Sequence, residues 1–284
     1  DADDFMHPEA LQKIHQSAIA LDDFTLVQYG YSYITEDKQQ ILHQVLPAHH
    51  QLIPKIFSSV PGPCHTLCIS KKLADAVGEF DPAIKSLEDW DYWLRAAKAG
   101  AKITFVDSAL VYYRYVRSSM SRNPFVMYES FKTVANRATK KDSRITIEAI
   151  ENRDYEFDST EVIQKALIRF AGVGVMQNKT EETLQLFIRE SVKLLTNYQP
   201  RDFEDMCSYL SFRYWYSKED VKEVLNNIKP NFIQFFKKAG YSEIFIDHAV
   251  YFIFKRHFFY QNIYNYGKPI GSVLNYLLRR KYKS

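Results

Sequence analysis

Hydrophobic positions in the first part of the chain follow two spacings, one typical of helices and one typical of strands. The helical segments are 8–21, 71–77 and 88–99, and the strand segments are 24–34 and 102–116. In the clearest helix, Trp90, Trp93, Leu94 and Ala97 recur at i, i+3, i+4 and i+7, and Gly100 is a typical C-terminal stop. Helices that alternate with strands predict an α/β fold.

The pattern changes after Asn123. A further helix is predicted over 124–140, followed by a polar, charged connector over 141–158. Later segments all have helical spacing, with breaks near Asn178, Pro200 and Pro230. The expected organisation is an α/β part over residues 1–123, a helix with a polar connector over 124–158, and an all-α C-terminal domain over 159–284.

Aromatic residues are concentrated in the C-terminal part, in runs such as 212–216, 232–236 and 251–260. One interpretation is a module that binds an acceptor or a membrane surface. The other is an aromatic core between helices, which we favour because periodic aromatic residues usually pack inward.

Composition indicates a folded globular chain, since 46% of its 284 residues are hydrophobic and 25% are charged. It has no apolar run long enough to span a bilayer. Three scattered cysteines without an apolar leader favour a reduced, cytoplasmic compartment. Cys64 and Cys68 flank His65, but no second ligand pair follows at a usable spacing, so we expect no zinc site.

Positive charge is concentrated at the end of the chain. Residues 237–284 contain nine Lys or Arg and two Asp or Glu, a net charge of +7, whereas the whole chain carries +3. Interleaved with Phe, Tyr and Leu, these cations suit a helix that rests on anionic lipid, for instance peripherally at the inner face of the cell membrane. A solvated basic face explains them equally well, and nucleic acid is a weaker explanation because no recognition motif accompanies the charge.

The chain opens with an acidic cluster, Asp1, Asp3 and Asp4. Carboxylate oxygens suit a hard cation such as Mg²⁺ or Mn²⁺, which would neutralise charge on a nucleotide diphosphate. Acidic residues are also common in solvated turns, and Asp4 or His7 could cap a helix that begins near Pro8.

A second set of residues strengthens the interpretation of the opening acidic cluster as a metal site. The segments, in chain order, are Gly78-Glu79-Phe80-Asp81, Glu88-Asp89-Trp90-Asp91-Tyr92-Trp93-Leu94-Arg95, Tyr113-Arg114 and Ser119-Met120-Ser121. Together with the opening aspartates, this ordered set resembles the family 2 glycosyltransferases of the GT-A fold, over about residues 1 to 123. The resemblance implies part of a GT-A mixed sheet with helices, and a metal-dependent hexosyltransferase-like enzyme.

In such an enzyme, Asp89 matches the catalytic base of a single displacement that inverts the anomeric carbon. Asp1 and Asp3 match the metal site, with Asp4 beside them. Glu88 and Trp90 are weaker candidates for contacts to the donor, the diphosphate or the acceptor. Read from the residues alone, Ser86-Leu87-Glu88-Asp89 is a capping box, and a helix N-terminus also keeps a carboxylate ionised at neutral pH.

The loop after Arg114 departs from the family pattern. Many relatives have a histidine three residues before the first serine of Ser-x-Ser, where this chain has Val116. Arg114, Arg117 or Arg122 could supply a phosphate contact instead, although solvated surface charges are the more common state. His65, in a turn that leads into a short strand, is a weak candidate for acceptor contact and more often a structural histidine.

The resemblance begins at the metal motif, which in the GT-A fold follows βα units that bind the nucleotide. Three such units imply about ninety further residues. We therefore expect residues 1 to 284 alone to be inactive, and the parent to move a sugar from a nucleotide-sugar donor to a glycan, lipid or protein acceptor. Synthesis of cell-surface polysaccharide or glycoconjugate would fit. The alternative is a noncatalytic scaffold or pseudoenzyme whose helical half binds a partner.

Overall fold

The computed structural model describes residues 4–35, 41–47, 51–114, 123–212 and 217–282. The chain divides into two compact units, which are described separately. The first comprises residues 1–122 and 126–163, and the second comprises 123–125 and 164–284. The helix predicted over 124–140 and the connector after it therefore belong almost entirely to the first unit.

The first unit contains a mixed sheet with the strand order β1-β5-β2-β3, in which β4 also pairs with β2. Its strands are β1 (Phe5–Met6), β2 (Thr25–Ile34), β3 (Ile41–Val45), β4 (Leu67–Cys68) and β5 (Lys102–Arg114). Its helices are α1 (Ala10–Ala18), α2 (Lys71–Val77), α3 (Glu88–Lys98) and α4 (Pro124–Ala138), with short 3₁₀ turns at Lys55–Phe57 and Cys64–Thr66.

The central strands β2 and β5 run parallel, and the other pairs are antiparallel. These two strands coincide with the segments 24–34 and 102–116, so the expected α/β class is confirmed. The short strands β1 and β3 were not expected, because β1 has only two residues and the Ile-Leu-His-Gln-Val sequence of β3 does not alternate between apolar and polar residues.

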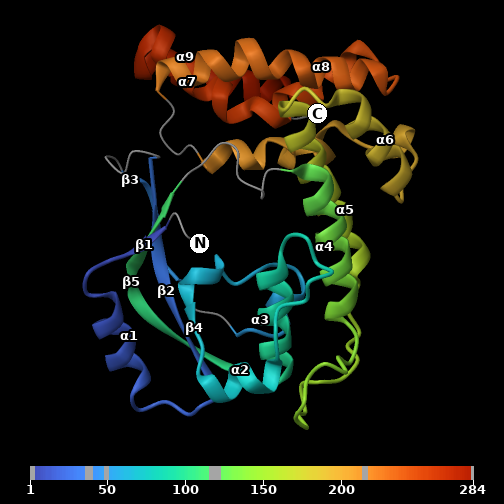
Figure 1. Ribbon diagram of the computed structural model, residues 1–284. Coiled ribbons are helices and arrows are strands. Elements are labelled where there is room, and N and C mark those ends of the chain that lie inside the picture. The colour runs from blue at the N-terminus through green and yellow to red at the C-terminus, as the bar shows by residue number, and fades with distance from the viewer. Residues whose placement is uncertain (1–3, 36–40, 48–50, 115–122, 213–216, 283–284) are drawn as a thin grey trace. The chain divides into compact units, whose positions relative to one another are not determined.

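Each face of the sheet is covered by different segments. Figure 1 shows α1 on one side and α2 and α3 on the other. On the α1 side, buried residues of the helix form one hydrophobic cluster with residues of β2 and β5. They are Ala10, Ile14, Val27, Tyr29, Val106, Leu110 and Val111.

Gly30 lies where β5 bulges beside β2, between the pairs Tyr29 with Val106 and Tyr31 with Val111. A Cβ atom at Gly30 would lie 2.5 Å from the Val45 carbonyl oxygen and 3.1 Å from that of Ser108. Both neighbours are backbone atoms and cannot turn away, so only glycine allows the three strands to approach at this point.

The second unit is helical. Its elements are α5 (Ser159–Met176, which begins in the first unit), α6 (Thr180–Glu190), a 3₁₀ turn (Leu195–Asn197), a 3₁₀ segment (Pro200–Phe212), α7 (Lys218–Glu223), a π-helical segment (Val224–Ile228), α8 (Lys229–Lys238) and α9 (Glu243–Lys281). The break at Asn178 is confirmed by its left-handed φ of 62°. The break near Pro230 is also confirmed, since the π-helical segment ends at Ile228 and Pro230 lies in the first turn of α8, where proline costs no helical hydrogen bond.

Aromatic side chains fill the interior of this unit. Phe187, Phe203, Phe232, Phe235, Phe236 and Phe254 are fully buried. Their rings meet edge-on in several pairs, such as Phe203 with Phe236 and Phe232 with Phe254. The preference for an aromatic core is confirmed for these residues, whereas most of the run 212–216 lies outside the described residues. In the described part of the chain, no helix combines the length and apolarity needed to cross a bilayer.

Candidate active site

The candidate catalytic helix α3 begins without a side-chain cap. Its N-cap residue is Leu87, which has a left-handed φ of 60°, a conformation that is costly for a branched side chain. The capping box expected at Ser86 is wrong, because the Ser86 hydroxyl lies 2.7 Å from the sulfur of Met127 on α4. The backbone turn that presents Asp89 is therefore held by packing rather than by a cap.

Asp89 is half-buried in the first turn of α3, and its Oδ1 accepts a hydrogen bond of 2.7 Å from the Trp90 backbone N–H. Burial raises the pKa of Asp89 to about 6, and the neighbouring Glu88 carboxylate adds to the rise, although the Trp90 hydrogen bond opposes it. Asp89 makes no ion pair with a described residue. The carboxylate is still mostly ionised at pH 7, and it is a stronger base than an ordinary aspartate.

Trp90 has a structural position. It is fully buried, its indole N–H donates a hydrogen bond of 2.7 Å to the Ile56 carbonyl, and its ring lies 4.8 Å from that of Phe131. A buried and hydrogen-bonded indole is not available to a donor or acceptor sugar. Glu88, by contrast, is exposed at the start of the helix.

The segment beside Asp89 is held to the sheet by buried polar groups. Gln28 on β2 is buried and donates a hydrogen bond of 2.6 Å to the Pro61 carbonyl. The Thr66 hydroxyl donates to the Pro63 carbonyl at 2.7 Å and closes the turn. These bonds fix the short turn that carries Cys64 and His65.

Cys64 lies close enough to Asp89 for their charges to interact. Partial burial of the thiol raises the pKa of Cys64 to about 11, and the carboxylates of Asp89 and Glu88 contribute to the rise, although the residue as a whole remains solvent-accessible. An exposed thiol with a raised pKa is poorly suited to act as a nucleophile. The pKa of Cys64 can instead be used to detect the charge on Asp89.

The next residue, His65, faces the other motif. Its Nδ1 lies 3.5 Å from the Oδ2 of Asp4, and its ring stands edge-on to Tyr113 with centroids 5.0 Å apart. The Oδ1 of Asp4 accepts a hydrogen bond of 2.8 Å from the Arg114 backbone N–H. Asp4 therefore ties the start of the chain to the end of β5, and it caps no helix.

The other predicted metal ligands, Asp1 and Asp3, lie outside the described residues, as do Val116, Arg117 and Arg122. Among the residues that are described, no group of three His, Cys, Asp or Glu is arranged to hold a metal ion. The Asp4 side chain is only 4% exposed, and its Oδ1 already accepts the hydrogen bond from Arg114.

Asp91, two residues after Asp89, is the centre of an ion network that sequence reasoning missed. Its fully buried carboxylate accepts hydrogen bonds from Arg95 at 3.1 Å, from Arg137 at 3.1 Å and from Arg144 at 2.9 Å. The spacing of Asp91 and Arg95 by four residues on a helix was a visible signal. The two other arginines come from the segment after the resemblance ends, and no linear pattern connects them to Asp91.

The network also includes two further aspartates. Asp81 accepts from Arg137 at 2.8 Å, and Asp142 accepts from Arg144 at 2.6 Å. The Ala83 backbone N–H and Arg137 lower the pKa of Asp81. Burial acts to raise the pKa of Asp142, but the hydrogen bonds from Arg144 outweigh it and lower the pKa.

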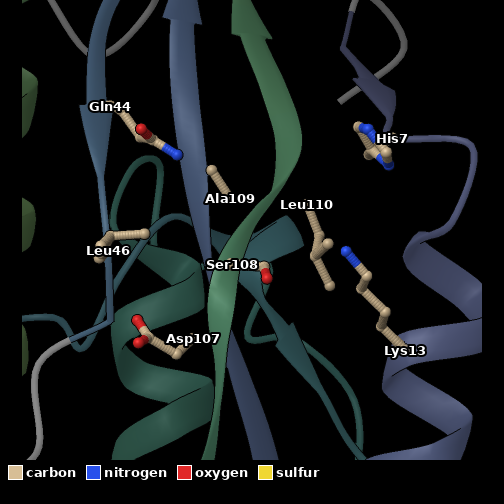
Figure 2. A pocket seen from close by; sticks show the side chains of 8 residues that line it. All are labelled: His7, Lys13, Gln44, Leu46, Asp107, Ser108, Ala109 and Leu110. Atoms are coloured by element: carbon tan, nitrogen blue, oxygen red, sulfur yellow. The ribbon is translucent and has the colours of Figure 1, made fainter.

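A surface hollow of about 360 Å³ lies around the β5 bulge. Figure 2 shows the side chains of His7 and Lys13 on one side of β5 and those of Gln44 and Leu46 on the other. Neither Asp4 nor Asp89 lines this hollow, and its mixture of cationic, anionic and apolar groups matches no single ligand. The hollow and the candidate active site are therefore separate features.

Comparison with known proteins finds no matching family model, no matching curated protein and no matching solved structure. The functional argument therefore depends on the residues and their geometry.

Proposed function

We propose that the chain forms the catalytic-base and acceptor side of an inverting family 2 glycosyltransferase with a GT-A fold. The enzyme transfers a sugar from a nucleotide-sugar donor to a hydroxyl of a glycan, lipid or protein acceptor. One observation carries the proposal. Of the two aspartates in the helix motif, Asp91 is buried among three arginines, whereas Asp89 is half-buried, makes no ion pair with a described residue and has a pKa of about 6.

The arrangement around Asp89 adds support. Cys64 lies within electrostatic range of Asp89, and the adjacent His65 contacts Asp4, which in turn binds Arg114. Contacts thus link Asp89 to segments that are far apart in the sequence. The left-handed Leu87 before Asp89 agrees with this interpretation, since strained backbone is concentrated at functional sites.

In the proposed reaction, Asp89 accepts the proton of the acceptor hydroxyl while that oxygen attacks the anomeric carbon. The bond from the anomeric carbon to the phosphate oxygen breaks, and its electron pair leaves with the nucleoside diphosphate. Asp1 and Asp3 would hold Mn²⁺ or Mg²⁺, which when bound neutralises charge on the diphosphate. A base with a pKa of about 6 is ionised at neutral pH and remains basic enough to assist the attack.

The scaffold alternative also has an observation in its favour. Trp90, Asp91 and Arg95 are all buried, so much of the helix motif serves the interior of the first unit. A noncatalytic relative would keep these residues and would not depend on Asp89.

The test is sugar transfer by the natural gene product that contains these residues, assayed with Mn²⁺ and a set of nucleotide sugars. We expect Asp89→Asn to lower kcat about 10²-fold to 10⁴-fold, because loss of a general base has effects of that size. The rate should rise with pH through about 6, since the base must be deprotonated to act. Asp107→Asn, at an exposed position on β5 outside the candidate active site, is the matched control and should retain most of the activity.

Circular dichroism should show that both variants are folded. Full activity of Asp89→Asn, or no transfer from any donor by the unaltered protein, would favour the scaffold.

A further inference from the structure

Helix α9 of the second unit is a hairpin of two helical arms. Gly267 interrupts it with φ 75° and ψ 166°, a backbone conformation that is open essentially only to glycine. We call residues 243–266 the first arm and residues 268–281 the second arm. The arms run antiparallel, since Asn275 donates to the Phe259 carbonyl at 3.2 Å and the Tyr282 hydroxyl donates to Asp247 at 2.9 Å.

The inner side of the second arm is closely packed against the first. A Cβ atom at Gly271 would lie 2.8 Å from the Asn262 carbonyl oxygen. Tyr282, just after the arm, stacks on Tyr251 with ring centroids 4.0 Å apart. The basic tail is therefore a defined structure with one face committed to the first arm and one face left over.

The outer face of the second arm carries an exposed apolar stripe. Ile270, Val273 and Leu277, at i, i+3 and i+7, are 59%, 60% and 54% exposed. Tyr266, 55% exposed, stands beside Gly267 at the hairpin tip, and Tyr276, 59% exposed, flanks the stripe. Large apolar side chains are seldom this exposed as a contiguous set unless something covers them.

Exposed cations lie on the same arm as this stripe, and Arg280, three residues after Leu277, adjoins it. The side chains of Lys268, Arg279 and Arg280 are exposed, and they form no ion pair with any residue that the structure describes. Other cations of the tail are paired within the unit, as Lys255 is with Glu204 and Lys281 with Asp247. The second arm thus carries both an exposed apolar stripe and three exposed cations without an ion pair among the described residues.

We propose that the outer face of the second arm, together with the hairpin tip, is a docking surface for an anionic lipid membrane. The apolar stripe enters the boundary between headgroups and acyl chains, and the three cations contact lipid phosphates. Tyrosines at the tip suit the same interfacial depth. This inference does not depend on the proposed transferase activity.

Two other occupants fit the surface less well. A second copy of the chain in a symmetric contact would bring its own three cations against these three, which is repulsive. A nucleic acid would satisfy the cations but would leave the apolar stripe against a hydrated phosphate backbone. A surface that combines apolar and cationic groups is best matched by anionic lipid.

The experiment is flotation of the full chain with vesicles of phosphatidylcholine alone and of three parts phosphatidylcholine to one part phosphatidylglycerol. We expect binding to the anionic vesicles only, weakened when salt is raised from about 0.05 M to about 0.5 M. The triple variant Lys268→Gln, Arg279→Gln and Arg280→Gln should lower the partition coefficient at least about tenfold.

The matched control removes the same charge elsewhere, by Lys141→Gln, Lys218→Gln and Lys222→Gln, all at exposed positions. It should change the partition coefficient by less than about twofold, because none of these side chains belongs to the second arm or the hairpin tip. A second triple variant, Ile270→Ser, Val273→Ser and Leu277→Ser, tests the apolar stripe and should also reduce binding. Truncation at residue 266 is less informative, since it would expose the packed side of the first arm.

Three outcomes would overturn the proposal. The chain could fail to bind anionic vesicles, or the control triple could lose as much binding as the first triple. A third outcome would be absent vesicle binding together with another occupant of the surface. That occupant would be a second copy of the chain if the Ile270, Val273 and Leu277 substitutions abolish dimerisation in solution. It would be nucleic acid if the chain binds duplex nucleic acid and these substitutions leave that binding unchanged.

Discussion

At the scale of single residues, Asp89 and Asp91 lie in the same turn of α3 and have opposite surroundings. Three arginines satisfy the carboxylate of Asp91, whereas Asp89 receives a hydrogen bond only from the adjacent backbone N–H among the contacts described. Burial without a cation raises the pKa of Asp89. The same residue type therefore has a structural role at one position and a candidate chemical role at the other.

Cys64 gives a direct test of this electrostatic environment. In Asp89→Asn, the pKa of Cys64 should fall below its value of about 11 and remain above the ordinary 9.0, because burial is the larger cause and persists. The rate of alkylation by iodoacetamide as a function of pH, resolved by peptide mass spectrometry, measures this. Asp107→Asn, at an exposed position on β5, is the control. An unchanged Cys64 pKa in Asp89→Asn would show that the two groups do not interact.

Asp91 should be important for stability. Asp91→Asn leaves Arg95, Arg137 and Arg144 with a neutral partner, and breaking a buried ion pair in this way costs about 3–5 kcal/mol. Urea unfolding followed by tryptophan fluorescence reports on this unit through Trp90 and Trp93 once Trp215 of the second unit is replaced by Phe. The exposed Glu88→Gln should change the free energy of unfolding by no more than about 0.5 kcal/mol. A loss below about 1 kcal/mol for Asp91→Asn would contradict the assigned role.

At the scale of elements, glycines mark the places where backbones approach one another. Gly30 lets three strands meet at the β5 bulge, and Gly271 lets the two arms of α9 come into contact. Neither position is recognisable from hydrophobic periodicity. The constraint on Gly30 comes from a strand that is distant in the sequence, and the constraint on Gly271 comes from the first arm, against which Gly267 folds the second arm back.

Gly271→Ala distinguishes helix propensity from packing between the arms, because the two effects change the free energy of unfolding in opposite directions. In an isolated helix, this change should stabilise by about 1 kcal/mol. Here the added methyl group would meet the Asn262 backbone, so we expect a loss of about 1–3 kcal/mol instead. Urea unfolding followed by circular dichroism measures it, with the exposed Ser272→Ala as control. Stabilisation by Gly271→Ala would show that the arms are not packed as described.

At the scale of the whole molecule, the two units differ in how their stability depends on pH. His257 in the second unit is buried, and burial, with the nearby Arg256, lowers its pKa to about 4 from 6.5. The unfolded state therefore binds a proton at higher pH than the folded state does. Stability from a neutral His257 is present above about 6.5 and is lost as the pH falls towards 4.

The first unit should respond differently over the same range. The folded pKa of Asp89 is raised to about 6, so acidification from about 6 to about 4 favours the folded state. Asp81 and Asp142 have lowered pKa values, so their stabilisation is present above the ordinary 3.8 and is lost only as the pH falls below it.

We therefore expect the second unit to lose about 3 kcal/mol between pH 6.5 and 4, while the first unit is stable down to about pH 4. Urea unfolding at several pH values would resolve the two units. Circular dichroism reports mainly on the helical unit, and tryptophan fluorescence reports on the first unit in a Trp215→Phe background, which leaves only Trp90 and Trp93. His257→Phe should remove the loss in the second unit. A parallel decline of both units above pH 4 would contradict this assignment.

The sequence by itself determined the α/β class of the first unit, the two long strands, the helix over residues 88–98 with its stop at Gly100, and the helical character of the C-terminal part. These features follow from periodicity and turn chemistry, which act between neighbours in the chain. The sequence also indicated Asp89 and His65 as candidates. Their suggested chemistry comes from the family resemblance.

Tertiary structure decided which candidates are buried and which remain accessible. It placed Trp90 in the interior, engaged Asp4 with Arg114, surrounded Asp91 with Arg137 and Arg144, and folded the basic tail back on itself. Each outcome depends on contacts between segments tens of residues apart, or on one glycine that reverses a helix. The burial that raises the pKa of Asp89 exists only when those segments meet. Which face of α9 is left exposed is decided in the same way.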